Sequence, residues 1–409
     1  MKLLNQGAYG CVFQPGFNCT GAKESTKKYL TKIQKKKNTS DKETRIGALV
    51  QKTSAYTKYF APIIETCDVD LTKVKDDELQ KCDFVDLQRM QSARFETNKI
   101  RYVGSKTLAE YFHDKTQHSG STFLFFKQFI HSYTILMEAV RKLAAANIIH
   151  FDLKENNIMC RAKTGRPIII DFGLSIYAEN IASENFQPDD AFFTYGPDYP
   201  PWCIDICFLT YIVELGKTKD DWATTPITPE SWNPVIQDFI RQNAVFTEML
   251  TKEETETFQS TMSTYFQTMV DSAYYGTPTW KTVYDAFIAG WKTWDSYSIA
   301  VIYLQMMKQF HLDKYATQVS FVDQFLRLLK DVVLATPDKR PVSDEIIASA
   351  NNIFSKVPKK EAKNLQNDLL VLFKNKVLYN EREKTLAASK LQTRKREDRL
   401  YGVLNNRTT

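Results

Sequence analysis

The chain has 409 residues, 43% of them hydrophobic and 25% charged, a balance typical of a soluble globular protein of about two to three domains. It contains no run of about 18 apolar residues and begins without a long apolar core, so we expect neither a transmembrane helix nor a signal peptide. The net charge of +6 is mild, and acids are interleaved with the bases of the C-terminal tail, so we do not expect nucleic acid as a partner. The seven cysteines lack C-x-x-C spacing, which predicts reduced thiols in a cytoplasmic protein, with no disulfide framework and no structural metal.

The chain opens on a short segment that contains Gly7 and Gly10. Glycine lets a backbone approach phosphate oxygens because no Cβ intervenes, although two glycines in a plain turn would look the same. The alternating residues from Tyr29 to Ile33 then predict a strand in which Lys32 has apolar neighbours. Lysines are abundant nearby, so a solvated surface lysine is the alternative interpretation of Lys32.

A helix is predicted next, from about Asp41 to Thr53, with Ser40 as its N-cap. It carries Glu43, whose carboxylate could pair with the strand lysine. Asp41 is the other acidic candidate for that pairing, and a plain surface glutamate is the alternative interpretation of Glu43.

Two further strands are expected at Phe60 to Ile64 and at Lys99 to Gly104, separated by a polar and irregular insertion over residues 66–98. The apolar spacing from Phe123 to Ala146 predicts a long buried helix. Asn147 is suited to the left-handed conformation that commonly ends a helix.

The most informative stretch follows this helix. The residues His150-Phe151-Asp152-Leu153-Lys154-Glu155-Asn156-Asn157 have the pattern H-x-D-L-K-x-x-N, and the apolar strand after them ends in Asp171-Phe172-Gly173. Residues 158–160 and 167–170 would form a hairpin with Gly165 in its turn, which brings Asn157 and Asp171 to one place. A hydroxyl that attacks a phosphate needs an acceptor for its proton, and Asp152 could supply it. Oxygens of Asn157 and Asp171 are ligands of the kind that Mg²⁺ prefers.

The two motifs together resemble the catalytic loop and the metal-binding loop of eukaryotic-type protein kinases, over residues 1 to about 350. The stretches Gly7 to Phe13, His150 to Lys154 and Trp294 to Ser298 are more specifically similar to the divergent Ser/Thr kinases of nucleocytoplasmic large DNA viruses. This resemblance implies an α+β, two-lobed kinase fold. Its parts would be a nucleotide-binding N-lobe over residues 1–103, a catalytic C-lobe over residues 104–355 with a helical insertion at about 206–292, and a basic helical tail over residues 356–409.

The same resemblance implies a protein Ser/Thr kinase that uses ATP with Mg²⁺ or Mn²⁺ on protein substrates, in the host cytoplasm or the virion. The catalytic residues would be Asp152, Lys154, Lys32 and Glu43. The metal ligands would be Asn157 and Asp171. The nucleotide would be bound by Asn5, Gln6, Gly7, Ala8, Tyr9, Gly10, Val12, Leu30, Lys32, Ile100, Arg101 and Val103.

Several positions depart from the family pattern, beginning with Asn5 in place of the first glycine of the loop. Phe151 stands where kinases commonly have an arginine that pairs with a phosphorylated loop, so we expect activity that loop phosphorylation need not switch on. The A-P-E motif is missing after the activation segment at residues 174–202, and Asp205 is expected to replace it by pairing with Arg340.

Asp295 is expected to bond backbone N–H groups near His150, with Asp205 as the rival for that role. Inside the insertion, Thr251 and Glu254 have the spacing of a helix capping box. Two other hypotheses remain, a pseudokinase that acts as an ATP-binding scaffold and a small-molecule kinase. The complete D-L-K and D-F-G motifs and the Pro-x-x-Arg-Pro turn argue against the second.

Overall fold

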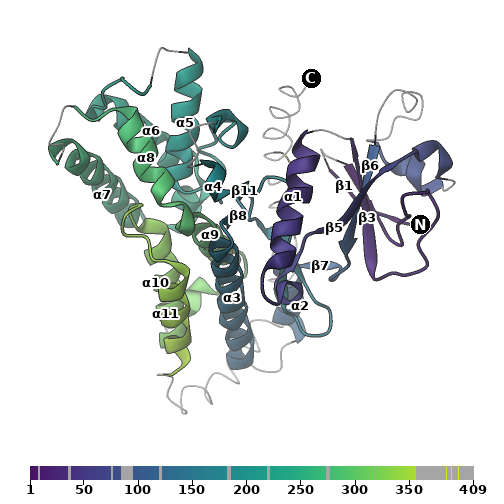
Figure 1. Ribbon diagram of the computed structural model, residues 1–409. Helices are drawn as coiled ribbons and strands as arrows, with labels where there is room; N and C mark the ends of the chain where they lie inside the picture. The colour runs from purple at the N-terminus through teal and green to yellow at the C-terminus, as the bar shows by residue number, and fades with distance from the viewer. Residues whose placement is uncertain are drawn as a thin grey trace.

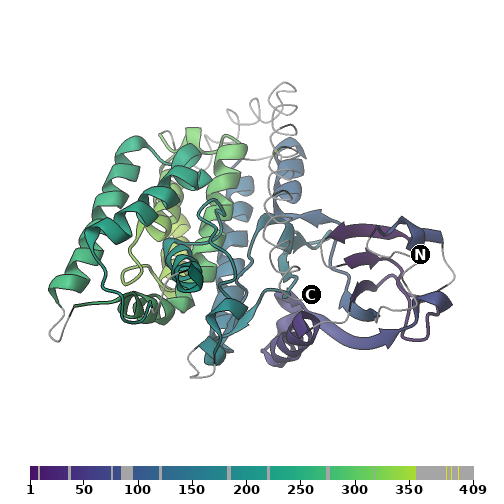
Figure 2. The ribbon, with the colours of Figure 1, turned by 90° about the horizontal axis from the view of Figure 1, so that it is seen from above.

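The computed structural model describes residues 1–7, 10–35, 38–74, 77–83, 95–118, 122–181, 186–218, 222–272, 277–317 and 319–355, together with Lys384, Ala388 and Lys395. The rest of the predicted tail at 356–409 lies outside the described residues, as do Ala8 and Tyr9. Within the described ranges the chain is α+β. A β-rich N-terminal region lies beside a mostly helical C-terminal region, as Figure 1 and the turned view in Figure 2 show.

The N-terminal region is built on a five-stranded antiparallel sheet in the order β1-β2-β3-β6-β5. In that order the strands span Leu3–Gly7, Gly10–Phe13, Tyr29–Lys35, Phe95–Arg101 and Ile63–Val69. Side-chain alternation places buried Cys11, Phe13 and Ile33 in one apolar cluster. Helix α1 (Asn38–Lys52) packs against β5 and contributes Ile46 and Val50 to the larger core of the molecule.

The prediction of an irregular insertion over residues 66–98 is wrong at both ends, because β5 continues to Val69 and β6 begins at Phe95. These two residues are paired in the sheet. Strand β5 lies at the sheet edge and its middle residues are half-buried or exposed, so it carries polar side chains that obscure the strand pattern. Helix α1 begins at Asn38, which places Ser40 inside the helix and not at its N-cap.

Two disulfides contradict the expectation that all cysteines are reduced. They join Cys11 to Cys82 and Cys19 to Cys67, whereas Cys160, Cys203 and Cys207 are free and buried. The paired cysteines are 71 and 48 residues apart, so no local spacing marks them. Cys11 on β2 meets Cys82, which directly follows η3 (Asp77–Lys81), and η3 packs against β1. Cys19, between β2 and β3, meets Cys67 on β5.

A second sheet connects the two regions of the molecule, with the order β4-β10-β9-β7. Its strands span Phe60–Ala61, Pro167–Ile170, Ile158–Cys160 and Lys106–Thr107. Strand β4 comes from the N-terminal region and pairs in parallel with β10. A short pair, β8 (Ile148–Ile149) with β11 (Ile176–Tyr177), lies beside this sheet. The strands that flank the H-x-D-L-K stretch are therefore held where the two regions meet.

The C-terminal region is mainly helical, and among the described residues two long helices lie between β7 and β8 in the chain and seven follow β11. They are α2 (Leu108–His118), α3 (Thr122–Ala145), α5 (Ile204–Thr218), α6 (Pro229–Gln242), α7 (Lys252–Asp271), α8 (Trp280–Ala289), α9 (Trp294–Gln309), α10 (Ser320–Leu334) and α11 (Ser343–Ser355). Short helical turns are α4 (Ala178–Ile181), η1 (Tyr56–Lys58), η2 (Leu71–Lys73), η4 (Glu155–Asn157), η5 (Pro188–Asp190), η6 (Val245–Met249), η7 (Trp291–Thr293) and η8 (Asp313–Tyr315). None of the helices within the described ranges is long and apolar enough to cross a membrane.

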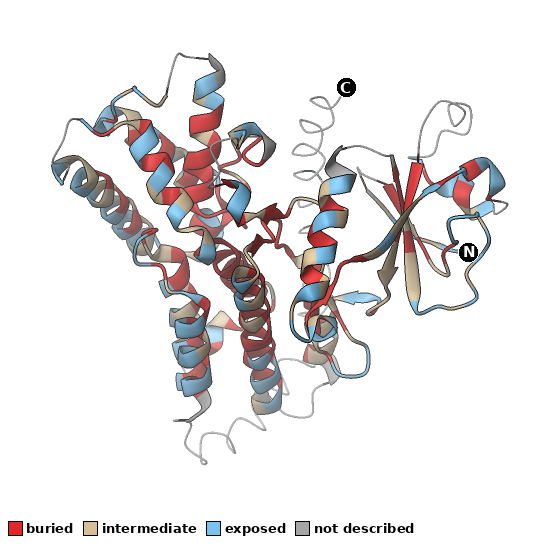
Figure 3. Cartoon of the chain, viewed as in Figure 1, coloured by how far each residue is buried: buried red, intermediate tan, exposed pale blue. Residues whose placement is uncertain are grey.

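Several local predictions for this region are confirmed. The long buried helix is α3, which carries a continuous buried face (Figure 3), and Asn147 after it has a φ of 56°. The described residues between 206 and 292 are mostly helical, as predicted, and the Thr251–Glu254 capping box opens α7.

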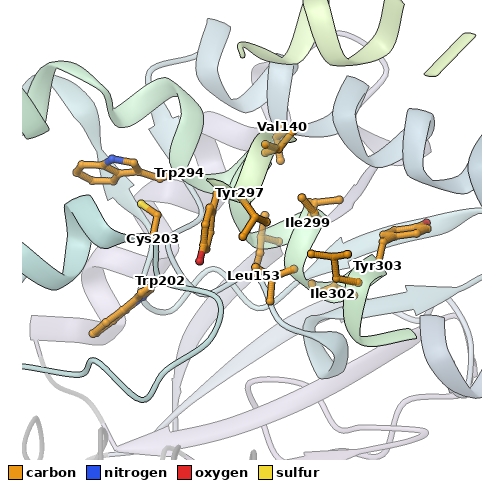
Figure 4. Packing of buried hydrophobic residues seen from close by; sticks show 14 of the residues in the cluster. Val140, Leu153, Trp202, Cys203, Trp294, Tyr297, Ile299, Ile302 and Tyr303 are labelled. Atoms are coloured by element: carbon orange, nitrogen blue, oxygen red, sulfur yellow. The ribbon is translucent and has the colours of Figure 1, made fainter. Parts of the chain in front are cut away.

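The helix α9 packs between α3 and α10, and from Trp294 to Leu304 every residue is buried. Figure 4 shows Leu153 of the H-x-D-L-K stretch among side chains of α9, which include Tyr297, Ile299 and Ile302. Helix α9 therefore supplies part of the apolar packing around Leu153.

Candidate active site

The backbone of residues 150–157 is held by the carboxylate of Asp295, at the start of α9. Asp295 accepts hydrogen bonds from the backbone N–H groups of His150 (2.7 Å) and Phe151 (3.0 Å). Phe151 has a φ of 68°, a left-handed conformation that costs a side-chain-bearing residue about 1–2 kcal/mol. Burial raises the pKa of Asp295, against the opposing effects of His150 and the two N–H donors. The prediction for Asp295 is confirmed, and its rival Asp205 has another role.

Asp205 forms a buried bidentate ion pair with Arg340, as expected. The two guanidinium nitrogens lie 2.7 and 3.0 Å from the two carboxylate oxygens, and the indole N–H of Trp294 donates to the same carboxylate at 3.2 Å. Burial lowers the pKa of Arg340, but the charge of Asp205 outweighs this and raises it. The pair ties the start of α5 to the turn before α11, next to the helix that supports His150.

The carboxylate of Asp152 is buried and receives hydrogen bonds from three side chains. Lys154 Nζ (2.8 Å) and Asn157 Nδ2 (3.0 Å) both donate to Oδ2. The hydroxyl of Tyr199 donates to Oδ1 at 2.7 Å. The predicted residues Asp152, Lys154 and Asn157 are thus in direct contact. Tyr199 was missed by sequence reasoning, because the aromatic and turn-rich stretch around it marks a loop without singling out one hydroxyl.

The predicted hairpin is present, with β9 and β10 antiparallel and Gly165 at a φ of 65° in the turn. Asn157 precedes the first strand and Asp171 follows the second. His150 Nε2 lies 3.0 Å from the carbonyl oxygen of Ile170, which links the loop at 150–157 to the residue before Asp171. Burial would raise the pKa of Asp171, but the charges of Lys32 and Lys154 outweigh it and lower the pKa, so the carboxylate is ionised.

Lys32 on β3 and Glu43 on α1 form the expected pair, with Nζ lying 3.0 and 3.2 Å from the two carboxylate oxygens. The same Nζ is 3.7 Å from Asp171 Oδ1. Asp41, the alternative acid, is exposed. Burial lowers the pKa of Lys32, but Glu43 and Asp171 outweigh this and raise it. For Glu43, burial raises the pKa, and its effect is larger than the opposing effect of Lys32. One lysine therefore connects the N-terminal sheet to the acidic end of the hairpin.

The described residues of the glycine segment belong to the antiparallel strands β1 and β2, in which Gly7 pairs with Gly10. A Cβ on Gly10 would lie 1.7 Å from the carbonyl oxygen of Ile33, so only glycine fits there. The register pairs Val12 with Lys32, which brings the segment beside the lysine.

Other predicted nucleotide-binding residues lie at the same sheet. Asn5 and Gln6 are on β1, Leu30 pairs with Ile100 between β3 and β6, and Arg101 ends β6 just before Val103. The side chain of Gln6 bonds Asp83, with its Nε2 lying 2.6 Å from the carboxylate. The side chain of Arg101 donates to the carbonyl oxygens of Thr57 and Phe60, so only its backbone remains as a candidate contact for a base.

The side chains at Asn157 and Asp171 are chemically suited to a hard cation. The Nδ2 of Asn157 bonds the backbone and side chain of Asp152, which leaves its Oδ1 as the atom suited to a cation. Asp171 is ionised and 45% exposed. Mg²⁺ typically binds one or two such side chains and takes its other ligands from waters and phosphates. Among the described residues, no group of three or more His, Cys, Asp or Glu side chains gathers into a larger metal cluster.

Two groups of contacts form the candidate site: Asp152 with Lys154 and Asn157, and Lys32 with Glu43 and Asp171. The contact between His150 and Ile170, and the charge of Lys154, which lowers the pKa of Asp171, link the two groups. No protein-family model matches the chain, and no curated protein matches it either.

Proposed function

We propose that the chain is an ATP-dependent protein kinase with a two-lobed kinase fold, which transfers the γ-phosphoryl group to serine and threonine hydroxyls of proteins. The observation that carries this proposal is a set of four side-chain contacts, two made by Asp152 and two made by Lys32. Asp152 contacts Lys154 and Asn157 on one side, and Lys32 contacts both Glu43 and Asp171 on the other. All six residues were predicted as site residues from the two motifs, the strand lysine and the helix glutamate, and the Lys32–Glu43 pairing was expected.

In this proposal each residue acts through its charge and position. Asp152 accepts the hydrogen bond of the acceptor hydroxyl and takes its proton as the new O–P bond forms, while the bonding electrons of the old O–P bond leave with ADP. Lys154, 2.8 Å from Asp152, offsets negative charge on the group in transfer. Lys32, kept cationic by its acidic neighbours, binds phosphate oxygens of the nucleotide. Asn157 and Asp171 would hold Mg²⁺, which when bound neutralises charge on the phosphates.

The test is transfer from labelled ATP to a mixture of proteins, with the labelled residue types then identified. Asp152→Asn is expected to lower the rate by about 10²–10⁴-fold while Mg-ATP still raises the melting temperature. The matched control is Asp285→Asn, an exposed aspartate on α8 that pairs only with Lys281 of the same helix among the described contacts. Full activity in the Asp152→Asn protein would refute the assignment.

A pseudokinase that binds ATP as a scaffold is the second candidate. It is favoured by the hydroxyl of Tyr199, which already occupies Oδ1 of Asp152, the atom that an acceptor would approach. A thermal shift with Mg-ATP, combined with no transfer to any protein including the chain itself, would select this candidate over the active kinase.

The location is proposed on the family resemblance alone, as the host cytoplasm or the virion. Cysteine chemistry does not support this location, because four cysteines form disulfides and disulfides persist mainly in oxidising surroundings. Non-reducing electrophoresis of the protein recovered from each location, after thiol blocking, would show where the disulfides exist.

A further inference from the structure

One turn of the chain, within residues 192–202, makes two hydrogen bonds to the stretch that carries Asp152. The hydroxyl of Tyr199 donates to Asp152 Oδ1 at 2.7 Å, and the indole N–H of Trp202 donates to the carbonyl oxygen of Phe151 at 3.0 Å. The turn itself is closed by backbone bonds from Tyr199 N to Gly196 O and from Trp202 N to Tyr199 O. The phenol and the indole are therefore held at fixed spacing.

Aromatic packing keeps this turn in place. Tyr199 is 2% exposed and Trp202 is 1% exposed, and their ring centroids are 5.2 Å apart in an edge-to-face arrangement. The ring of Phe151 lies 5.2 Å from Trp202 and 6.0 Å from Phe192. It also lies 6.3 Å from Trp294, which Figure 4 shows on the same side of the core as Trp202 and Cys203. Such pairs contribute about 0.5–1.5 kcal/mol each beyond their burial. Moving the phenol away from Asp152 would break several of these contacts together.

The position of Phe151 explains how this packing arises. An arginine at this point would carry its charge into the same aromatic cluster, whereas phenylalanine fills it. The cluster joins residues 192–202 to the loop at 150–157 through apolar contact and two neutral donors, none of which needs a phosphate group. A fixed attachment is therefore favoured over a segment that swings in and out.

We propose that Tyr199 is a positioning residue for Asp152 in phosphoryl transfer. Its phenol holds Oδ1 while Lys154 and Asn157 hold Oδ2, so the carboxylate keeps one orientation toward the acceptor hydroxyl. Each carboxylate oxygen can accept two hydrogen bonds, so the phenol and the acceptor hydroxyl can share Oδ1. This inference rests on the proposed kinase function and adds a residue that its two motifs do not contain.

The test compares Tyr199→Phe with the wild-type full-length chain in steady-state transfer to a protein acceptor. The substitution removes one hydroxyl and keeps the ring, so the aromatic cluster persists. We expect kcat to fall about 10–100-fold, because a small misplacement of a catalytic group costs this much, while the KM for ATP stays within about twofold. In the Asp152→Asn background the same substitution is expected to change the residual rate less than about twofold.

The matched control is Tyr195→Phe, because Tyr195 lies on the same segment, is half-buried, and makes no contact with Asp152 among the described hydrogen bonds. It should keep kcat within about twofold of wild type. Replacing Tyr199 with p-aminophenylalanine by amber suppression restores an N–H donor and should recover most of the lost kcat. If the Tyr199→Phe protein fails to fold, the comparison that decides is between the p-aminophenylalanine protein and wild type. A p-aminophenylalanine protein that folds but is inactive would overturn the proposal.

The possible outcomes distinguish a failure of the proposed kinase function from a failure of the role proposed for Tyr199. A wild-type chain that binds Mg-ATP and transfers nothing removes the kinase function and this inference with it. An active wild type whose kcat is unchanged by Tyr199→Phe overturns the inference alone. A rise in kcat would also overturn it, since that would show that the phenol blocks the access of the acceptor hydroxyl to Asp152.

Discussion

The buried ion pair between Arg340 and Asp205 gives a sharp prediction about stability. Their side chains are 1% and 0% exposed, and two N–H···O contacts of 2.7 and 3.0 Å join them. In Arg340→Met the Asp205 carboxylate would remain buried with the Trp294 indole as a donor but without a cation. Removing one partner of a buried pair costs about 3–5 kcal/mol, because the other charge is left in a medium that solvates it poorly.

Urea denaturation under non-reducing conditions measures this cost as a shift in midpoint. The control is Arg327→Met on α10, since Arg327 pairs with Asp323 at 2.8 Å but is 74% exposed, and an exposed pair contributes less than about 1 kcal/mol. The double variant Asp205→Leu, Arg340→Met should regain at least about half of the loss, because no charge is then buried. A loss for Arg340→Met no larger than that for Arg327→Met would refute the reasoning, as would a double variant whose loss equals the sum of the single losses.

Three further predictions concern other parts of the chain. Glu43→Gln should lower the transfer rate about 10–100-fold and raise the KM for ATP, because Lys32 loses its charged partner at 3.0 Å; unchanged kinetics would contradict its orienting role. The pKa of Glu254 is lowered, because Lys330 and the N–H of Thr251 outweigh its burial. Ionised Glu254 therefore contributes about 1 kcal/mol to the free energy of unfolding above the ordinary pKa of a glutamate, and this contribution is lost as the pH falls through the lowered pKa. The urea midpoints of wild type and Glu254→Gln should consequently differ at pH 7 and become equal in acid. Replacing Cys11 and Cys82 by serine opens a link across 71 residues and should cost about 4 kcal/mol in the chain-entropy model, and alkylation of all seven cysteines in the unfolded but unreduced protein would show that the disulfides are absent.

Local sequence signals predicted the elements closest to the site. The hairpin of β9 and β10 was expected at its observed residues, because short apolar runs of three and four residues flank a turn that contains Gly165. The end of α3 at a left-handed Asn147 and the capping box at Thr251 likewise depend on neighbours three or four residues away. The pairs Asp205–Arg340 and Asp295–His150 join distant residues, and they were expected only because the motifs resemble those of a known family.

Other features depended on the tertiary structure. The Tyr199–Asp152 contact spans 47 residues, and the Cys11–Cys82 and Cys19–Cys67 disulfides span 71 and 48. The polar edge strand β5 was also missed, since it becomes a strand only by pairing with β6. Periodicity and capping report on residues within one or two turns, whereas these contacts form when separate elements pack against each other. The sequence by itself therefore indicated which side chains belong to the candidate site, and the packing of residues 192–202 on the loop at 150–157 decided how the carboxylate of Asp152 is held.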